Sequence, residues 1–268
     1  MILTRLFYRT KKFTAFKAML IISIITSCSS APKRPMEVRT VYQACSQNLE
    51  TAKTFIASGN YESAGTSLKK NQNLDLSIDN YDLLISTKLS FISLYLSLES
   101  PDIQAARKCL NEANAYIPNS DKPQRNMALY TLAKLRIVIT SHSDFDYKSL
   151  MEELKEAEKY FSGEAFYKAQ CQSISGDLNR INGDYKEADK HYQEAVKLFT
   201  SERYLSEIGI TWYKIAQNRS LSGDKKSALE ALEKAIYYDR CAENSVALGS
   251  DYYIKGVILL KGKTCSKF

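Results

Sequence analysis

The chain has 268 residues and a formal net charge of +7, and 44% of its residues are hydrophobic. It contains only ten glycines and five prolines, too few turn residues for a many-stranded sandwich or barrel. The composition also excludes collagen-like, mucin-like and disordered classes. No apolar stretch reaches about 18 residues, which excludes a multi-span membrane protein. We therefore expect an all-α protein.

The first 27 residues have the features of an export signal. Five basic residues and no acidic one precede a short apolar run, Ala18–Ile25, which small residues follow. The run is well under the roughly 20 residues that span a bilayer, so a permanent transmembrane anchor is the weaker alternative. Removing residues 1–27 takes five from the 37 basic side chains and leaves 32 against 30 acidic ones, a net charge of +2. Nucleic-acid binding needs a concentrated basic face, so we expect no nucleic-acid partner.

The apolar run ends in Ile25-Thr26-Ser27-Cys28. This tetrapeptide resembles the lipobox of bacterial lipoproteins, in which an aliphatic residue and two small residues precede the acylated cysteine. The resemblance implies a lipid on Cys28, loss of the signal peptide 1–27, and a lipidated tether over 28–40. Ser29 implies the outer membrane in bacteria that sort lipoproteins by the residue after the cysteine. An ordinary cleavage site, with Cys28 as a chance small residue, is the alternative.

One sequence phrase recurs through the rest of the chain. Its clearest copy is the turn Gly183-Asp184-Tyr185, followed by Ala188, Tyr192 and Ala195. Residues at i, i+4 and i+7 lie on one helical stripe, and small residues at its ends let a second helix approach closely. The position of Ala188 is filled in the other copies by Ala64, Ala106, Leu150 and Ala228. Each phrase follows another amphipathic segment, which predicts a series of helical hairpins.

These phrases resemble tetratricopeptide repeats. Trp212, Ile215 and Ala216 stand at family positions of a first helix, and Gly176 and Gly256 stand at its close-packing position. The resemblance implies an irregular α-solenoid of about five hairpins plus a C-terminal capping helix, over residues 41–268. The copies lie about 38–44 residues apart, whereas the family period is 34, so longer helices or loops must absorb the difference. We expect such loops near residues 119–125 and 141–147, and a generic helical bundle is the alternative.

The sequence contains no recognisable catalytic or metal-binding motif. Its two histidines and its cysteines lack the short spacings of a metal site, and it has no phosphate-binding loop or nucleophile elbow. We therefore expect no enzyme activity, no metal and no cofactor. Buried free thiols are expected rather than a disulfide framework, although pairing stays open for Cys45, Cys109, Cys171, Cys241 and Cys265.

The leading functional hypothesis is a scaffold that binds an extended peptide or a helix of another envelope protein. Stacked hairpins expose a long binding surface built from their first helices. The family resemblance places Tyr213, Gln217, Asp177 and Arg180 on that surface, although all four could simply be solvated helix residues. The alternative hypothesis is a lipid-anchored scaffold in a solute-uptake system, which requires an apolar pocket with a few polar groups.

The last predicted helix, residues 245–262, has two neighbouring apolar stripes. One contains Val246, Tyr253, Val257 and Leu260, and the other contains Leu248, Tyr252 and Leu259. Together they are wider than the stripe that packs on a single neighbour. We expect one stripe to cap the last hairpin and the other, Leu248, Tyr252 and Leu259, to be available to a partner or to a second copy of the chain. In the alternative, the preceding hairpin covers both stripes.

Overall fold

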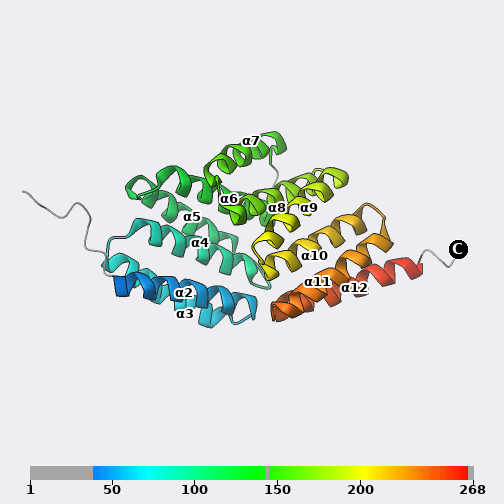
Figure 1. The fold of residues 1–268 in the computed structure, drawn as a ribbon, viewed down its shortest axis with the longest axis horizontal. Helices are drawn as coiled ribbons and strands as arrows, with labels where there is room; N and C mark the ends of the chain where they lie inside the picture. The colour runs from blue at the N-terminus through cyan, green and yellow to red at the C-terminus, as the bar shows by residue number, and fades with distance from the viewer. Residues whose placement is uncertain (1–38, 143–144, 265–268) are drawn as a thin grey trace, which may run out of the picture. The chain divides into compact units, whose positions relative to one another are not determined.

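The computed structural model describes residues 39–142 and 145–264 (Figure 1). The chain divides into two compact units, Met1–Tyr42 and Gln43–Phe268, and the features described below belong to the second. Its described part contains α-helices and two short 3-10 helices, with no strand. The helices are α2 (Arg39–Ala57), α3 (Tyr61–Ser77), α4 (Tyr81–Ser97), α5 (Ile103–Tyr116), α6 (Pro123–Ser141), α7 (Tyr147–Glu158), α8 (Ala165–Ile181), α9 (Tyr185–Ser201), α10 (Leu205–Leu221), α11 (Lys225–Cys241) and α12 (Ser245–Thr264), with η1 (Ile117–Asn119) after α5 and η2 (Lys159–Phe161) after α7.

The helices pair as antiparallel hairpins in chain order. The first helices are α2, α4, α6, α8 and α10, and each packs on the second helix that follows it. Successive first helices also touch one another from α4 to α12, so the hairpins stack as repeats do. This arrangement confirms the predicted all-α solenoid of five hairpins and a terminal helix. The signal peptide 1–27 and nearly all of the tether 28–40, including Cys28, lie outside the described residues.

Two residues of the recurring Gly-Asp turn determine its local structure. Gly183 and Gly223 take φ values of 87° and 91°, a left-handed conformation that glycine adopts without steric cost. After Gly223, the Asp224 side chain accepts a hydrogen bond at 3.0 Å from the backbone N–H of Ser227. That bond satisfies one of the unpaired amides at the start of α11. The glycine thus reverses the chain and the aspartate starts the second helix.

The small residues of the phrase lie where pairs of helices meet. Ala188, Ala195, Ala228 and Ala235 have no exposed surface. Ala188, Ala228 and Ala235 belong to one apolar cluster that spans α9 to α12, and Ala195 belongs to a neighbouring cluster with Phe199 and Ile208. Two further clusters fill the earlier hairpins. The repeat phrase is therefore the core of each hairpin.

The longer repeat spacing is absorbed mainly by long helices. Helices of 17 residues joined by three-residue turns give the 40-residue interval from Ala188 to Ala228. The loop expected near residues 119–125 is not a long one, because residues 120–122 alone connect η1 to α6 and Pro123 already begins that helix. The loop expected near residues 141–147 is present between Ser141 and Tyr147.

Candidate interaction face

The first helices present a connected set of polar side chains, here called the first-helix row: Ser93, Arg136, Ser173, Asp177 and Lys214. Arg136 of α6 donates to Ser93 Oγ of α4 at 3.3 Å. Lys214 Nζ of α10 donates to Ser173 Oγ at 2.9 Å and to Asp177 Oδ2 at 2.6 Å, both on α8. Residues from four successive first helices therefore lie on one face of the stack.

Asp177 is nearly buried, and its carboxylate is already bonded within the protein. Tyr192 of α9 donates its hydroxyl hydrogen to Asp177 Oδ1 at 2.8 Å, and Lys214 holds the other oxygen. The Tyr192 ring fits against Gly176, where an added Cβ would lie 2.4 Å from ring atom Cε1. Burial, followed by the charge of Asp177, raises the pKa of Tyr192. Asp177 thus joins α8, α9 and α10.

Arg180 and Tyr213 lie near each other across α8 and α10. Arg180 is half-buried and donates from Nε to the Tyr192 hydroxyl at 3.3 Å. Tyr213 is half-buried and accepts a hydrogen bond at 2.9 Å from Nε2 of Gln217, one turn further along α10. Burial and then the negative charge of Asp251 raise the pKa of Tyr213, while the charge of Arg180 opposes the shift.

Arg136 has a different environment from the other cations of the first-helix row. Its side chain is exposed to solvent, yet the protein around it desolvates the guanidinium and lowers its pKa. The negative charge of Asp177 opposes that shift. The Asp177 carboxylate itself is bonded to Tyr192 and Lys214. No carboxylate of the described residues forms an ion pair with Arg136. An exposed guanidinium without a counter-ion can bind an anionic ligand group.

The expected packing stripe of α12 was wrong, because Val246, Tyr253 and Leu260 are exposed. The helix packs instead through the side that lies opposite Gly249 and Gly256. Leu248, Ile254 and Ile258 join the apolar cluster of α9 to α12, and Asp251 is fully buried on the same side. Sequence reasoning missed Asp251 and Ile258. The exposed apolar residues of the helix come from both predicted stripes, namely Val246, Tyr252, Tyr253, Leu259 and Leu260.

The three residues of α12 that were expected to contact a partner differ in their exposure to solvent. Leu248 is half-buried in the apolar cluster, whereas Tyr252 and Leu259 are exposed. The hydroxyl of Tyr252 accepts a hydrogen bond from Arg240 of α11. Only Tyr252 and Leu259 thus offer a large apolar surface, while Leu248 contributes to holding α12 in place.

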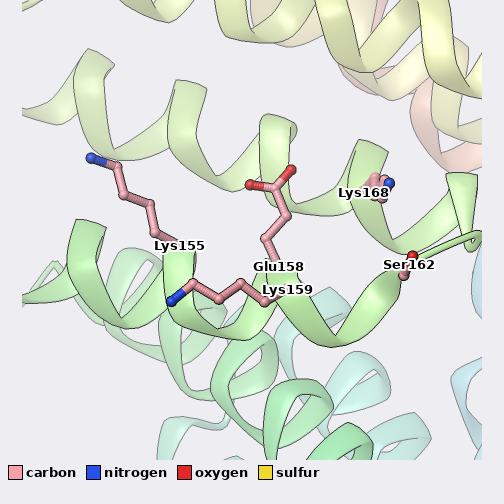
Figure 2. A pocket seen from close by; sticks show the side chains of 5 residues that line it. All are labelled: Lys155, Glu158, Lys159, Ser162 and Lys168. Atoms are coloured by element: carbon pink, nitrogen blue, oxygen red, sulfur yellow. The ribbon is translucent and has the colours of Figure 1, made fainter.

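A polar hollow lies between the end of α7 and α8 (Figure 2). Its lining consists of Lys155, Glu158, Lys159, Ser162 and Lys168. Figure 2 shows these side chains spread along the two helices rather than converging on one point. This lining is not the apolar pocket that a solute-binding role requires.

The cysteines occupy separate places in the fold. Cys45, Cys109 and Cys171 are buried, free and in different hairpins, whereas Cys241 is free and exposed. Burial raises the pKa of Cys45 and Cys171 to about 12, so neither is a reactive thiolate at neutral pH. Cys28 and Cys265 lie outside the described residues.

Within the part of the chain that the structure describes, no group of three His, Cys, Asp or Glu side chains could hold a metal ion. His191 lies against Gln172, with its Nδ1 at 2.8 Å from the amide oxygen. None of the described helices is long and apolar enough to span a membrane.

Comparisons with known proteins agree with this repeat architecture. Residues 210–240, which cover most of α10 and α11, match the family described as Tetratricopeptide repeat. A search of the curated proteins finds no match. The aspartyl phosphate phosphatase F of Bacillus subtilis has a similar structure, with a TM-score of 0.55 and 13% identity, covering 82% of this chain and 57% of that chain. This likeness shows the fold, a TPR-like helical solenoid, and the chain spans little more than half of the phosphatase.

Two further solved structures show weaker likeness. A signal transduction ATPase with a tetratricopeptide repeat sensor, from Pyrococcus horikoshii, has a TM-score of 0.47 and 16% identity, covering 83% of this chain and 35% of that chain. BtubC from P. vanneervenii has a TM-score of 0.47 and 14% identity, covering 77% of this chain and 92% of that chain.

Sequence reasoning missed two members of this face that carry its charge. Arg136 lies in a part of α6 where the repeat phrase is weak, and Lys214 lies beside the recognisable Trp212. Lys214 follows Trp212 by two residues, about 200° around the helix, so it lies on a different face from that recognised residue and read as solvated. No sequence signal distinguished Arg136 from an ordinary solvated arginine.

Proposed function

We propose that this protein is a bacterial envelope lipoprotein that holds a partner protein on the face formed by its first helices. The role is binding rather than catalysis. The partner presents an extended segment or a helix, and the lipid on Cys28 keeps the complex at a membrane, most simply the outer membrane. Tetratricopeptide repeats generally mediate protein–protein contacts, and the match over residues 210–240 supports this class of function.

The observation that carries the proposal is the environment of Arg136. Arg136 is exposed on a first helix, donates to Ser93 of the preceding first helix, and forms no ion pair with a described carboxylate, so its charge is available to a ligand. The group of Arg180, Tyr213 and Gln217, on the first helices α8 and α10, adds an aromatic surface and hydrogen-bonding atoms. Arginine and tyrosine are the residue types that contribute most at protein interfaces. We infer that the bound segment is acidic where it passes Arg136.

The interaction is tested by replacing Arg136 with Gln in the full-length protein. We expect the variant to melt like the parent and to lose at least tenfold in affinity for the partner that the parent captures. Arg107→Gln is the matched control, because Arg107 is exposed on α5, a second helix. Equal capture by all three proteins would refute a binding role for the first-helix row.

The anchor is tested separately by Cys28→Ala. One acyl chain binds a membrane only marginally, whereas the several chains of a lipoprotein give a stable anchor. We expect the parent in the detergent or membrane fraction and the variant in the aqueous fraction. A variant that still partitions with membranes as strongly as the parent would refute the lipoprotein assignment.

A further inference from the structure

Two aspartates meet in the buried contact between the last hairpin and the terminal helix. Asp239 on α11 and Asp251 on α12 have no exposed surface. None of their four carboxyl oxygens has a hydrogen-bond donor from another group. The two carboxyls lie within hydrogen-bonding reach of each other, so a bond forms between them only when one of them holds a proton.

The backbone of α10 packs against the two aspartates of α11 and α12. A Cβ atom added to Gly209 would lie 2.2 Å from Asp239 Oδ1 and 2.6 Å from its carboxyl carbon. The space that a side chain would fill at position 209 is therefore occupied by the Asp239 carboxyl. Asp239 and Asp251 thus lie between α10, α11 and α12, and they are the polar part of the surface that holds α12 on the last hairpin.

Cations of α11 and α12 are engaged elsewhere. Lys255 Nζ of α12 lies 2.5 Å from Glu233 of α11, Arg240 of α11 bonds to the hydroxyl of Tyr252 on α12, and Lys234 of α11 lies over the Trp212 ring. Burial is the main cause of the raised pKa of both aspartates, and the charge of Asp251 adds to the shift at Asp239. Among the described residues no cation bonds to either carboxyl.

The charged groups of α10 do not compensate the pair either. Lys214 is held by its bridge to α8, and Tyr213 has a raised pKa because of burial and the charge of Asp251. Glu207 also has a raised pKa, because burial outweighs the attraction of Lys53 on α2. Two ionised carboxylates at this place would thus repel each other in a poorly solvated site.

We propose that Asp239 and Asp251 form a proton-operated latch: a shared proton holds α12 on α10 and α11, and loss of that proton loosens the helix. The proposal goes beyond the scaffold function and does not depend on it. The latch differs from an ordinary ion pair because acid closes it and alkali opens it. Its opening would alter the end of the first-helix face, because Tyr213 lies beside Asp251.

The direction of the pH effect follows from the two pKa values. Burial raises the pKa of Asp239 to about 8, with a further contribution from the charge of Asp251, and burial raises the pKa of Asp251 to about 6. An unfolded aspartate has a pKa of about 3.9. A group whose pKa is raised by folding stabilises the fold fully below its unfolded pKa and loses that contribution as pH rises towards the folded value. The latch is therefore strongest near pH 4, holds one proton between about pH 6 and 8, and is ionised above that range.

The test is hydrogen–deuterium exchange of the full-length protein between pH 5 and pH 9, corrected for the intrinsic pH dependence of exchange. We expect α12 to lose at least tenfold of its protection across this range, while α8 and α9 keep theirs. Asp239→Asn removes one charge and lets the amide donate to Asp251, which imitates the singly protonated pair. In this variant α12 should stay protected at pH 9, and Asp251→Asn should do the same from the other side.

Asp189→Asn is the control, because Asp189 is a half-exposed partner of Arg219 at 2.9 Å, away from α12. It should leave the pH response of α12 unchanged. Protection of α12 that stays constant from pH 5 to pH 9 in the parent would overturn the proposal. A loss of protection that persists in both Asn variants would overturn it as well.

Discussion

The complete hairpin α8–α9 and the terminal helix α12 place the same residue type in opposite environments. Gly176 and Gly256 occupy the same position of the repeat pattern. At Gly176 an added Cβ would lie 2.4 Å from the Tyr192 ring, whereas no atom lies within 4 Å of the corresponding point at Gly256. A glycine at this position leaves room for the following second helix. Of the two helices compared, α8 is followed by such a helix, and α12 is followed by none among the described residues. A glycine in a repeat is therefore a packing site only when its cover is present.

The comparison extends to the apolar faces of the two segments. Tyr192 is fully buried between α8 and α9, whereas Tyr253 and Leu260 on α12 are 72% and 66% exposed. α12 is instead held from one side, by Leu248, Ile258 and the buried Asp251. Stability in α8–α9 thus comes from a filled interior, whereas α12 leaves large apolar side chains exposed and has a titratable pair in its buried contact with the last hairpin.

The largest expected effect is the loss of the ring that fills α8–α9. Tyr192→Ala removes a fully buried aromatic side chain and should lower the free energy of unfolding by about 3–5 kcal/mol, measured by chemical denaturation. Tyr192→Phe keeps the ring but takes the hydroxyl from Asp177, and it should cost about 1–3 kcal/mol. If Tyr192→Ala cost under about 1 kcal/mol, the ring could not be filling the core of the hairpin.

A smaller loss is expected from overpacking the small residues of the repeat. Ala188→Leu and Ala228→Leu insert a larger side chain at fully buried positions and should each cost about 1–3 kcal/mol, measured by denaturation. Ala115→Leu, at an exposed position of α5, is the control and should change the free energy of unfolding by under about 0.5 kcal/mol. Parent-like stability of both buried variants would remove the hairpin packing described above.

The smallest expected effect gives the clearest contrast, because alanine substitutions at the two glycines should change stability in opposite directions. Gly256→Ala meets open space and gains helix propensity, so it should raise stability by about 0.5–1 kcal/mol. Gly176→Ala gains the same propensity but forces the Tyr192 ring to move, so it should lower stability. The two melting temperatures should therefore move in opposite directions from that of the parent. A loss at both positions would show that α12 is covered as α8 is, and a gain at both would show that the Tyr192 ring does not close the site at Gly176.

The hairpins were predictable because their pattern is local. The small–bulky–small spacing predicted Ala188, Tyr192 and Ala195 as one buried stripe, and the Gly-Asp turns predicted where the second helices begin. The loop between α6 and α7 was visible in its polar composition. These features depend on neighbours within one or two helical turns, which a sequence shows directly.

The contacts between helices were not predictable in the same way. Asp239 and Asp251 read as ordinary solvated residues, because nothing in the sequence reports that Gly209 leaves room for a carboxyl between three helices. Gly256 was expected to be a packing site and has open space around it. Arg136 could not be distinguished from a surface arginine, because its lack of a counter-ion depends on where α4 and α8 place their polar side chains.

The central claim is that partners bind the first-helix face. Site-specific photo-crosslinking in intact cells tests it most directly, with a photoreactive amino acid in place of Thr140 or Gln217 in separate full-length proteins, and in place of Lys197 as a control. Thr140 lies one turn after Arg136 on α6, so Arg136 itself is kept, and Lys197 is exposed on α9, a second helix. The account predicts the same crosslinked partner from positions 140 and 217 and none from position 197. A partner captured from position 197 but from neither of the other two would contradict it.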